Sequence, residues 1–213
     1  TVSKSLQQLQ SVDLQPFFAV TKTGLPTSTD ALLVSHIRYR GFQGNIRDTT
    51  RPISFDQQAL SVLLSSSDLI SWRANGGITM SDSLGIRAVR RLYDVTGRTF
   101  PAFTIARDAF IAGNDLLYRS QFGLEPHKDQ ADTIKAVLTQ FVQKYREDPA
   151  FASRVDESVA RIIALKLKLY GSNFNIDTVL PSANLIGIGT SSQATFSVVR
   201  DAVTLVSPTQ AEL

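Results

Sequence analysis

In the first third of the chain, segments with apolar residues at helical spacing lie on either side of a short, continuous apolar run. Residues 5–20, SLQQLQSVDLQPFFAV, carry apolar side chains at roughly helical spacing, and a Gly- and Pro-containing stretch follows them. The run ALLVSHI (31–37) is apolar and of strand length. SFDQQALSVLLSSS (54–67) returns to helical spacing, with Ser54 as the expected N-cap. The pattern predicts helix, strand and helix in that order.

The middle of the chain repeats this alternation. GGITMSD (76–82) is a second predicted strand, and two helices are predicted in SLGIRAVRRLYDV (83–95) and PAFTIARDAFIAGN (101–114). DLLYR (115–119) is a third, short predicted strand. Strands that alternate with helices at this interval indicate βαβ units and a parallel sheet.

The pattern changes after residue 129. DTIKAVLTQFVQKYRED (132–148) and SRVDESVARIIALKLKLYG (153–171) are predicted to form two amphipathic helices, the second closed by Gly171. A connector rich in Ser, Thr and Asn then leads into FSVVRDAVTLVSPT (196–209), which predicts another helix and the start of a strand.

A sheet of three parallel strands is too small to stand alone. Its apolar strands need cover on both faces, and both of its edges would be open. A barrel of eight β/α units takes about 250 residues. The sequence therefore predicts an α/β fold that is the C-terminal portion, about three β/α units, of a (β/α)8 barrel of the TIM type. The N-terminal half of the barrel is expected to lie outside residues 1–213.

Composition and charge exclude several classes of function. The 213 residues are 43% hydrophobic and 19% charged, as in ordinary globular proteins. The net charge of +3 comes from 22 basic and 19 acidic residues without a basic block, so no nucleic acid is expected as a partner. Cysteine is absent, and the two histidines, His36 and His127, lie far apart, so we expect no metal and no cofactor. No segment approaches the ~20 apolar residues of a membrane span.

The second predicted strand ends in a carboxylate. Its apolar run climbs to Met80 and stops at Ser81-Asp82. In parallel α/β proteins the residues just after the C-terminal end of a strand line the active site, which makes Asp82 a candidate catalytic residue. Asp is also a favoured N-cap, and a helix is predicted to begin near Leu84. Position alone leaves both interpretations open.

Four segments together resemble a known family. PISFDQQALSVLL, GGITMSDSLGIRAV, ARDAFIAGNDLLYR and RVDESVARIIALK, in this order and at these separations, resemble the second half of the barrel of family 3 glycoside hydrolases. The resemblance is to the β-N-acetylglucosaminidase (β-hexosaminidase) branch, in which a strand ends in Ser-Asp-Asp-Leu-x-Met-x-Ala-Ile. It implies that residues 1–170 are the C-terminal part of the glycosidase barrel. Residues 171–213 would be a linker and the beginning of a second α/β domain.

The resemblance also assigns roles to residues. It implies that Asp82 is the catalytic nucleophile and that His36, at the end of the first strand, binds substrate. Ser83 departs from the family pattern where a second acidic residue is usual, and Ile86 replaces the usual Met. The Lys-His-Phe-x-Gly-His loop that carries the proton donor of this branch does not occur in the sequence. The acid/base residue is therefore expected outside this chain.

The implied activity is that of a retaining exo-β-N-acetylglucosaminidase. Such an enzyme removes a terminal β-linked N-acetylglucosamine through a covalent glycosyl-aspartate intermediate, here from N-acetylglucosaminides such as peptidoglycan or chitin fragments. A β-glucosidase of the same family is less favoured, because that branch usually has Trp just after Ser-Asp. A non-catalytic glycan-binding homologue is the third alternative, and Ser83 is its main support. Bacterial relatives with a second domain are often exported, which favours an extracellular or cell-envelope location.

Other polar or aromatic residues carry weaker signals. Arg38 and Tyr39 follow His36 into a loop, where a solvated position is favoured over contact with substrate beyond the first sugar. Structural roles are expected for the rest: turn formation for Asn114 and Asp115, packing for Trp72, a helix-start loop for His127, and a solvated or capping position for Asp156, Glu157 and Arg161.

Overall fold

The computed structural model describes residues 1–172, 175–180 and 193–203. The chain forms two compact units, residues 1–171 and 172–213. The described residues of the second unit include the helices α10 (Ile176–Val179) and α11 (Gln193–Ala202). The strand predicted to begin after α11 lies outside the described residues. No helix in the described ranges is long and apolar enough to cross a membrane.

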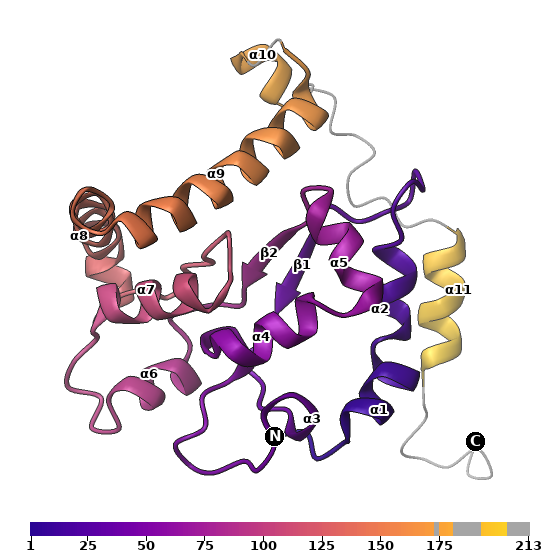
Figure 1. The fold of residues 1–213 in the computed structure, drawn as a ribbon, viewed down its shortest axis with the longest axis horizontal. Helices are drawn as coiled ribbons and strands as arrows, with labels where there is room; N and C mark the ends of the chain where they lie inside the picture. The colour runs from indigo at the N-terminus through magenta and orange to yellow at the C-terminus, as the bar shows by residue number, and fades with distance from the viewer. Residues whose placement is uncertain (173–174, 181–192, 204–213) are drawn as a thin grey trace, which may run out of the picture. The chain divides into compact units, whose positions relative to one another are not determined.

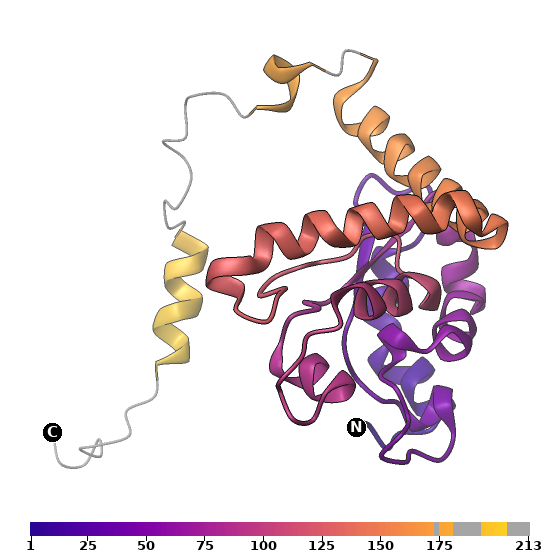
Figure 2. The same ribbon diagram turned by 90° about the vertical axis from the view of Figure 1, so that its left-hand side faces the viewer.

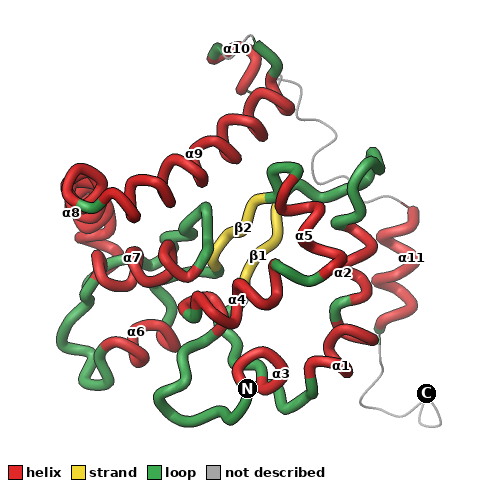
Figure 3. The backbone as a smooth tube through the Cα atoms, viewed as in Figure 1, coloured by secondary structure: helices red, strands yellow, loops and turns green. Residues whose placement is uncertain are grey.

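The first unit is an α/β structure with a small parallel sheet (Figures 1 and 3). Strand β1 (Ala31–Val34) pairs with β2 (Ile78–Ser81), and the register joins Ala31 to Ile78 and Val34 to Ser81. Both strands lie inside the predicted runs. The partial barrel predicted from the sequence requires further strands, which the described residues do not contain.

The third predicted strand, residues 115–119, is not a regular strand. It pairs with β2 only through a parallel bridge between Met80 and Leu116. Two residues later the backbone N–H of Tyr118 donates to the hydroxyl of Ser81 at 3.1 Å. The N–H of Tyr118 is thus bound to a side chain rather than to a backbone carbonyl of β2, and the parallel pairing ends there.

The first predicted helix is divided into three pieces. These are α1 (Leu6–Gln8), a π-helical turn (Leu9–Asp13) and α2 (Gln15–Val20). Pro16 explains the division, because it lacks an N–H and its ring crowds the carbonyl four residues earlier. The helix instead widens into the π-helical turn, in which the N–H of Leu14 donates to the carbonyl of Leu9 at 2.8 Å.

The segment after β1 also differs from the predicted single helix. It contains α3 (Arg40–Gln43), a 3₁₀ turn η2 (Ile53–Phe55), α4 (Gln57–Leu64) and α5 (Ser67–Ala74). The prediction that Ser54 is the N-cap of this helix is wrong. Asp56 caps α4, because its carboxylate accepts the N–H of Ala59 at 3.0 Å, while Ser54 is buried in η2.

Two helices follow β2. They are α6 (Arg87–Tyr93) and α7 (Ala102–Ala112), and α6 begins four residues later than predicted, so residues 82–86 form a loop. Buried apolar residues of these two helices, with others from η2, the loop after β2, residue 122 and α8, form the main core cluster. Its members are Phe55, Leu84, Val89, Ile105, Ala106, Ala109, Phe122 and Val137. The core therefore lies directly beneath the loop that follows β2.

Two long helices complete the first unit. Helix α8 (Pro126–Glu147) and helix α9 (Pro149–Tyr170) run in clearly different directions, as the two ribbon views show (Figures 1 and 2). The rings of Phe110, Phe141 and Phe151 meet at tilted angles with centroids 5.3–5.8 Å apart, and they join both helices to α7. Gly171 ends α9 with a φ of 65°, as predicted.

Candidate active site

The parallel register brings the ends of the two strands together. Because Val34 pairs with Ser81, the residues that follow each strand lie at the same edge of the sheet. The N–H of Asp82 donates to the carbonyl of Val34 at 3.1 Å, which continues the pairing by one residue. His36 reaches across this edge and contacts the carbonyl of Ser83 at 2.9 Å. The two residues singled out in the sequence, His36 and Asp82, are therefore neighbours.

Asp82 presents a partly free carboxylate. One oxygen, Oδ1, accepts the N–H of Ser83 at 2.7 Å, and in the described part of the chain the carboxylate has no other hydrogen bond. Helix α6 has Ile86 as its N-cap, so the alternative that Asp82 caps this helix is wrong. Asp82 is a half-buried carboxylate with one oxygen held by the backbone and the other without a hydrogen bond to the described residues.

His36 has both ring nitrogens engaged. Nδ1 lies 2.7 Å from the hydroxyl of Ser54, Nε2 contacts the carbonyl of Ser83, and the ring stacks on Phe55 with centroids 5.3 Å apart. Burial lowers the pKa of His36 from 6.5, although the Ser83 carbonyl and the charge of Asp82 act in the opposite direction. Both ring nitrogens are thus used within the protein, and the predicted contact of His36 with substrate stays a prediction.

The residue that departs from the family pattern is well accommodated. Ser83 is 7% exposed, and its hydroxyl donates to the carbonyl of Ser120 at 3.1 Å. A carboxylate at this position would face that carbonyl without a proton to donate, whereas a hydroxyl satisfies it. The segment 115–120 thus supports the loop after β2 by a contact separate from that of His36.

Two residues that the sequence did not mark fix the far end of the loop. A Cβ on Gly85 would lie 2.1 Å from the carbonyl oxygen of Gln121, so only glycine fits this close approach. Arg90 donates from Nε to the carbonyl of Gly85 at 2.7 Å and from Nη2 to the carbonyls of Gln121 and Gly123 at 2.6 Å. No local pattern marks either residue, since the carbonyls of Gln121 and Gly123 that they contact lie more than 30 positions along the chain.

A cavity of about 610 Å³ opens beside His36. Asp82 is not among its lining residues, whereas Arg38 is, and the guanidinium of Arg38 donates to the carbonyl of Asp48 at 3.2 Å. Tyr39 instead packs edge-to-face on Phe42 with ring centroids 6.0 Å apart. Among the described residues, no three His, Asp or Glu side chains are grouped so that they could hold a metal ion.

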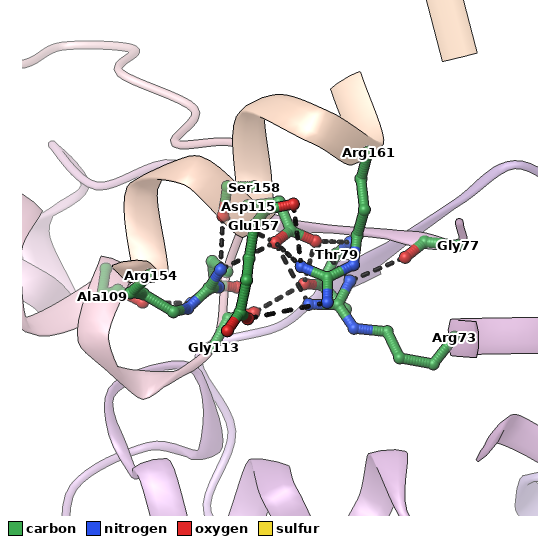
Figure 4. A network of polar contacts seen from close by, with 11 residues as sticks. Arg73, Gly77, Thr79, Ala109, Gly113, Asp115, Arg154, Glu157, Ser158 and Arg161 are labelled. Carbon is green, nitrogen blue, oxygen red and sulfur yellow. Dashed lines mark hydrogen bonds and ion pairs between the residues drawn. The ribbon is translucent and has the colours of Figure 1, made fainter. Parts of the chain in front are cut away.

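Asp115 is not the turn former that the sequence predicts. Its carboxylate is completely buried, and the guanidiniums of Arg73, Arg154 and Arg161 converge on it (Figure 4). The hydroxyl of Ser158 donates to it at 2.8 Å. It ties α5 and α9 together, so the solvated position expected for Arg161 is also wrong.

Three further residues can be compared with their expected roles. Asn114 is buried rather than in a turn, and its amide donates to the carbonyls of Ser54 at 3.0 Å and Ala109 at 2.7 Å. The expected packing role of Trp72 is confirmed, because it is buried and its ring lies against Gly77. His127 lies exposed in the first turn of α8.

No protein-family profile matches the chain, and no curated protein sequence matches it. Solved structures do. A fungal multi-domain family 3 β-N-acetylglucosaminidase matches 94% of the chain over 20% of its own length, with 22% identity and a TM-score of 0.61. A family 3 β-N-acetylglucosaminidase from Paenibacillus sp. str. FPU-7 matches 93% over 32% of its length, with 21% identity and a TM-score of 0.60.

A β-glucoside phosphorylase is similar to nearly the same extent. It matches 85% of the chain over 29% of its own length, with 19% identity and a TM-score of 0.56. The chain thus spans between a fifth and a third of these three structures. At these identities the likeness shows a shared fold: the chain is folded like part of family 3 glycoside hydrolases.

Proposed function

We propose that this chain is the C-terminal part of the catalytic barrel of a retaining exo-β-N-acetylglucosaminidase, with Asp82 as its nucleophile. The observation that carries the proposal is the carboxylate of Asp82 at the carboxyl end of β2, with Oδ1 held by the N–H of Ser83 and its other oxygen without a hydrogen bond to any described residue. The shared fold with family 3 glycosidases supports the same reading.

The first half of the reaction uses this free oxygen. It attacks the anomeric carbon of the terminal sugar, and the bond from that carbon to the leaving oxygen breaks with its electron pair passing to that oxygen. The leaving oxygen takes a proton from an acid residue that lies outside this chain. His36 is not that acid, because its ring nitrogens are bound to Ser54 and Ser83.

The second half releases the sugar from Asp82. The same outside residue, now a base, removes a proton from water, which attacks the anomeric carbon and breaks its bond to the carboxylate. Two displacements at one carbon retain its configuration. The N–H of Ser83 contributes by holding the carboxylate in one orientation through both steps.

One alternative function differs in the sugar that is hydrolysed, and the other lacks catalysis. Structural likeness to a β-glucoside phosphorylase keeps a glucoside-specific enzyme as the second candidate. A non-catalytic glycan-binding protein is the third. Its main support was Ser83, and the hydrogen bond of that hydroxyl to Ser120 gives the residue a role that does not require lost activity.

The test is hydrolysis of two chromogenic substrates by the natural full-length protein. We expect release of nitrophenol from nitrophenyl N-acetyl-β-glucosaminide and at least ~10²-fold slower release from the corresponding β-glucoside, because a site that binds the acetamido group leaves its polar partners unpaired without it. Faster release from the glucoside would favour the second candidate. No release from either would favour the non-catalytic one.

A further inference from the structure

His36 is held in one tautomer by its two hydrogen-bond partners. The carbonyl of Ser83 can only accept, so the ring nitrogen 2.9 Å from it, Nε2, carries the proton. Burial lowers the pKa of His36, which favours the neutral ring, and in the neutral ring Nδ1 is unprotonated and accepts the hydrogen of the Ser54 hydroxyl at 2.7 Å. The ring stacked on Phe55 is therefore a neutral imidazole with a defined donor and a defined acceptor.

The support behind His36 is rigid. Ser54 is completely buried in the turn η2, and its carbonyl accepts the amide of Asn114 at 3.0 Å. The same amide donates to the carbonyl of Ala109 in α7 at 2.7 Å. The hydroxyl that fixes the tautomer of His36 is therefore anchored to the core rather than to a loop.

In front of His36, Ser83 uses all of its polar groups. Its carbonyl accepts from His36, its hydroxyl donates to Ser120, and its N–H donates to Oδ1 of Asp82 at 2.7 Å. These bonds orient the two peptide units on either side of Ser83. The direction in which the N–H holds Asp82 thus depends on the bond that His36 makes to the carbonyl.

We propose that His36 is a positioning residue that orients the carboxylate of Asp82 through the backbone of Ser83. The proposal rests on the proposed function, since it treats Asp82 as the nucleophile. In this proposal His36 acts through its contact with the loop that carries the reacting carboxylate, and not through a contact with the sugar. A nucleophile displaced by a fraction of an ångström loses its line of attack on the anomeric carbon.

Charged groups of both signs lie around the ring, and the amino terminus at Thr1 also lines the cavity beside it. The titratable and charged groups near it are Asp82 after β2 and, in the shared cavity, Arg38, Asp48, Arg51, Arg91 and Tyr93. Burial lowers the pKa of His36. We therefore expect the imidazole to stay neutral at pH 7, in the Nε2–H tautomer.

The kinetic test compares three variants of the full-length protein. His36→Ala removes both bonds, His36→Gln keeps an amide that can donate to the Ser83 carbonyl, and His127→Gln is the matched control on the exposed histidine of α8. We expect His36→Ala to lower kcat about 10²-fold with KM nearly unchanged, His36→Gln to recover part of this loss, and the control to behave as wild type. A raised KM with unchanged kcat would identify a sugar-binding residue and overturn the proposal.

Two measurements decide the proposal without turnover. In ¹⁵N spectra of histidine-labelled wild-type protein, His36 should show the neutral Nε2–H tautomer at pH 7, and the Nδ1–H tautomer would overturn it. In a crystal structure of His36→Ala, the carboxylate of Asp82 should leave the Ser83 N–H, and an unmoved carboxylate would also overturn it. Failure of the proposed function is separate, because it appears as wild-type protein that hydrolyses neither glycoside.

Discussion

Asp82→Asn is expected to lower kcat for nitrophenyl N-acetyl-β-glucosaminide by about 10⁴-fold or more, the scale of loss when a nucleophile is removed. The side-chain amide keeps the shape of the carboxylate, and its oxygen can still accept the N–H of Ser83. It cannot form a stable ester bond to the anomeric carbon. The measurement is steady-state hydrolysis by the full-length variant, together with its thermal unfolding midpoint, which we expect to change little.

Two companion variants sharpen this test. Asp132→Asn removes an 84% exposed carboxylate on α8 that pairs with Lys135, and it should leave kcat unchanged. Asp82→Gly opens space for a small anion, so added azide should restore turnover and give a glycosyl azide of inverted configuration. Normal activity in Asp82→Asn would contradict the assignment of the nucleophile.

Asp115→Asn is expected to lower the free energy of unfolding by about 3–5 kcal/mol, the range for breaking a buried ion pair on one side. The substitution leaves the guanidiniums of Arg73, Arg154 and Arg161 gathered around a neutral group. Chemical unfolding of the full-length protein measures the loss, with Asp132→Asn again as the control, for which we expect less than about 0.5 kcal/mol. A loss as small as that of the control would contradict a structural role for the cluster.

The contribution of Asp115 to the free energy of unfolding should depend on pH. Burial pushes its pKa upward, but the hydrogen bond and charge of Arg73 together with the hydrogen bonds of Thr79 and Ser158 outweigh burial, and the pKa falls from 3.8 to about 2. A carboxyl group whose pKa is lower in the folded state stabilises the fold above its unfolded pKa and loses this contribution as pH falls through its folded pKa. The advantage of wild type over Asp115→Asn should therefore shrink between about pH 4 and pH 2.

The position of Asp82 could be predicted from the sequence because it follows from local pattern and a general property of parallel sheets. An apolar run of strand length ends at Ser81, and the residue after such a run lies at the edge where sites form. The two strands could be located for the same reason. What the pattern could not supply was the start of α6, because no clear capping residue marks Ile86.

The role of Asp115 could not be predicted, because its partners are distant in sequence. Arg73, Arg154 and Arg161 lie 42, 39 and 46 positions from it. Locally, an Asp after Gly-Asn is typical of a turn. Ser54 failed as an N-cap for a similar reason, since its hydroxyl is bonded to His36, 18 positions away, and Asp56 was free to cap the helix.

The most direct test of the central claim is to find the sugar on Asp82. The full-length protein would be quenched during slow turnover of a 5-fluoro N-acetylglucosaminyl fluoride, which keeps the acetamido group, then digested, and its peptides measured by mass spectrometry. We expect one added fluorosugar on the peptide that contains Asp82 in wild-type protein, and no added sugar on the same peptide of Asp82→Asn. A sugar on a different carboxylate, or steady turnover of the N-acetylglucosaminide with no adduct on any peptide, would contradict a glycosyl-Asp82 intermediate.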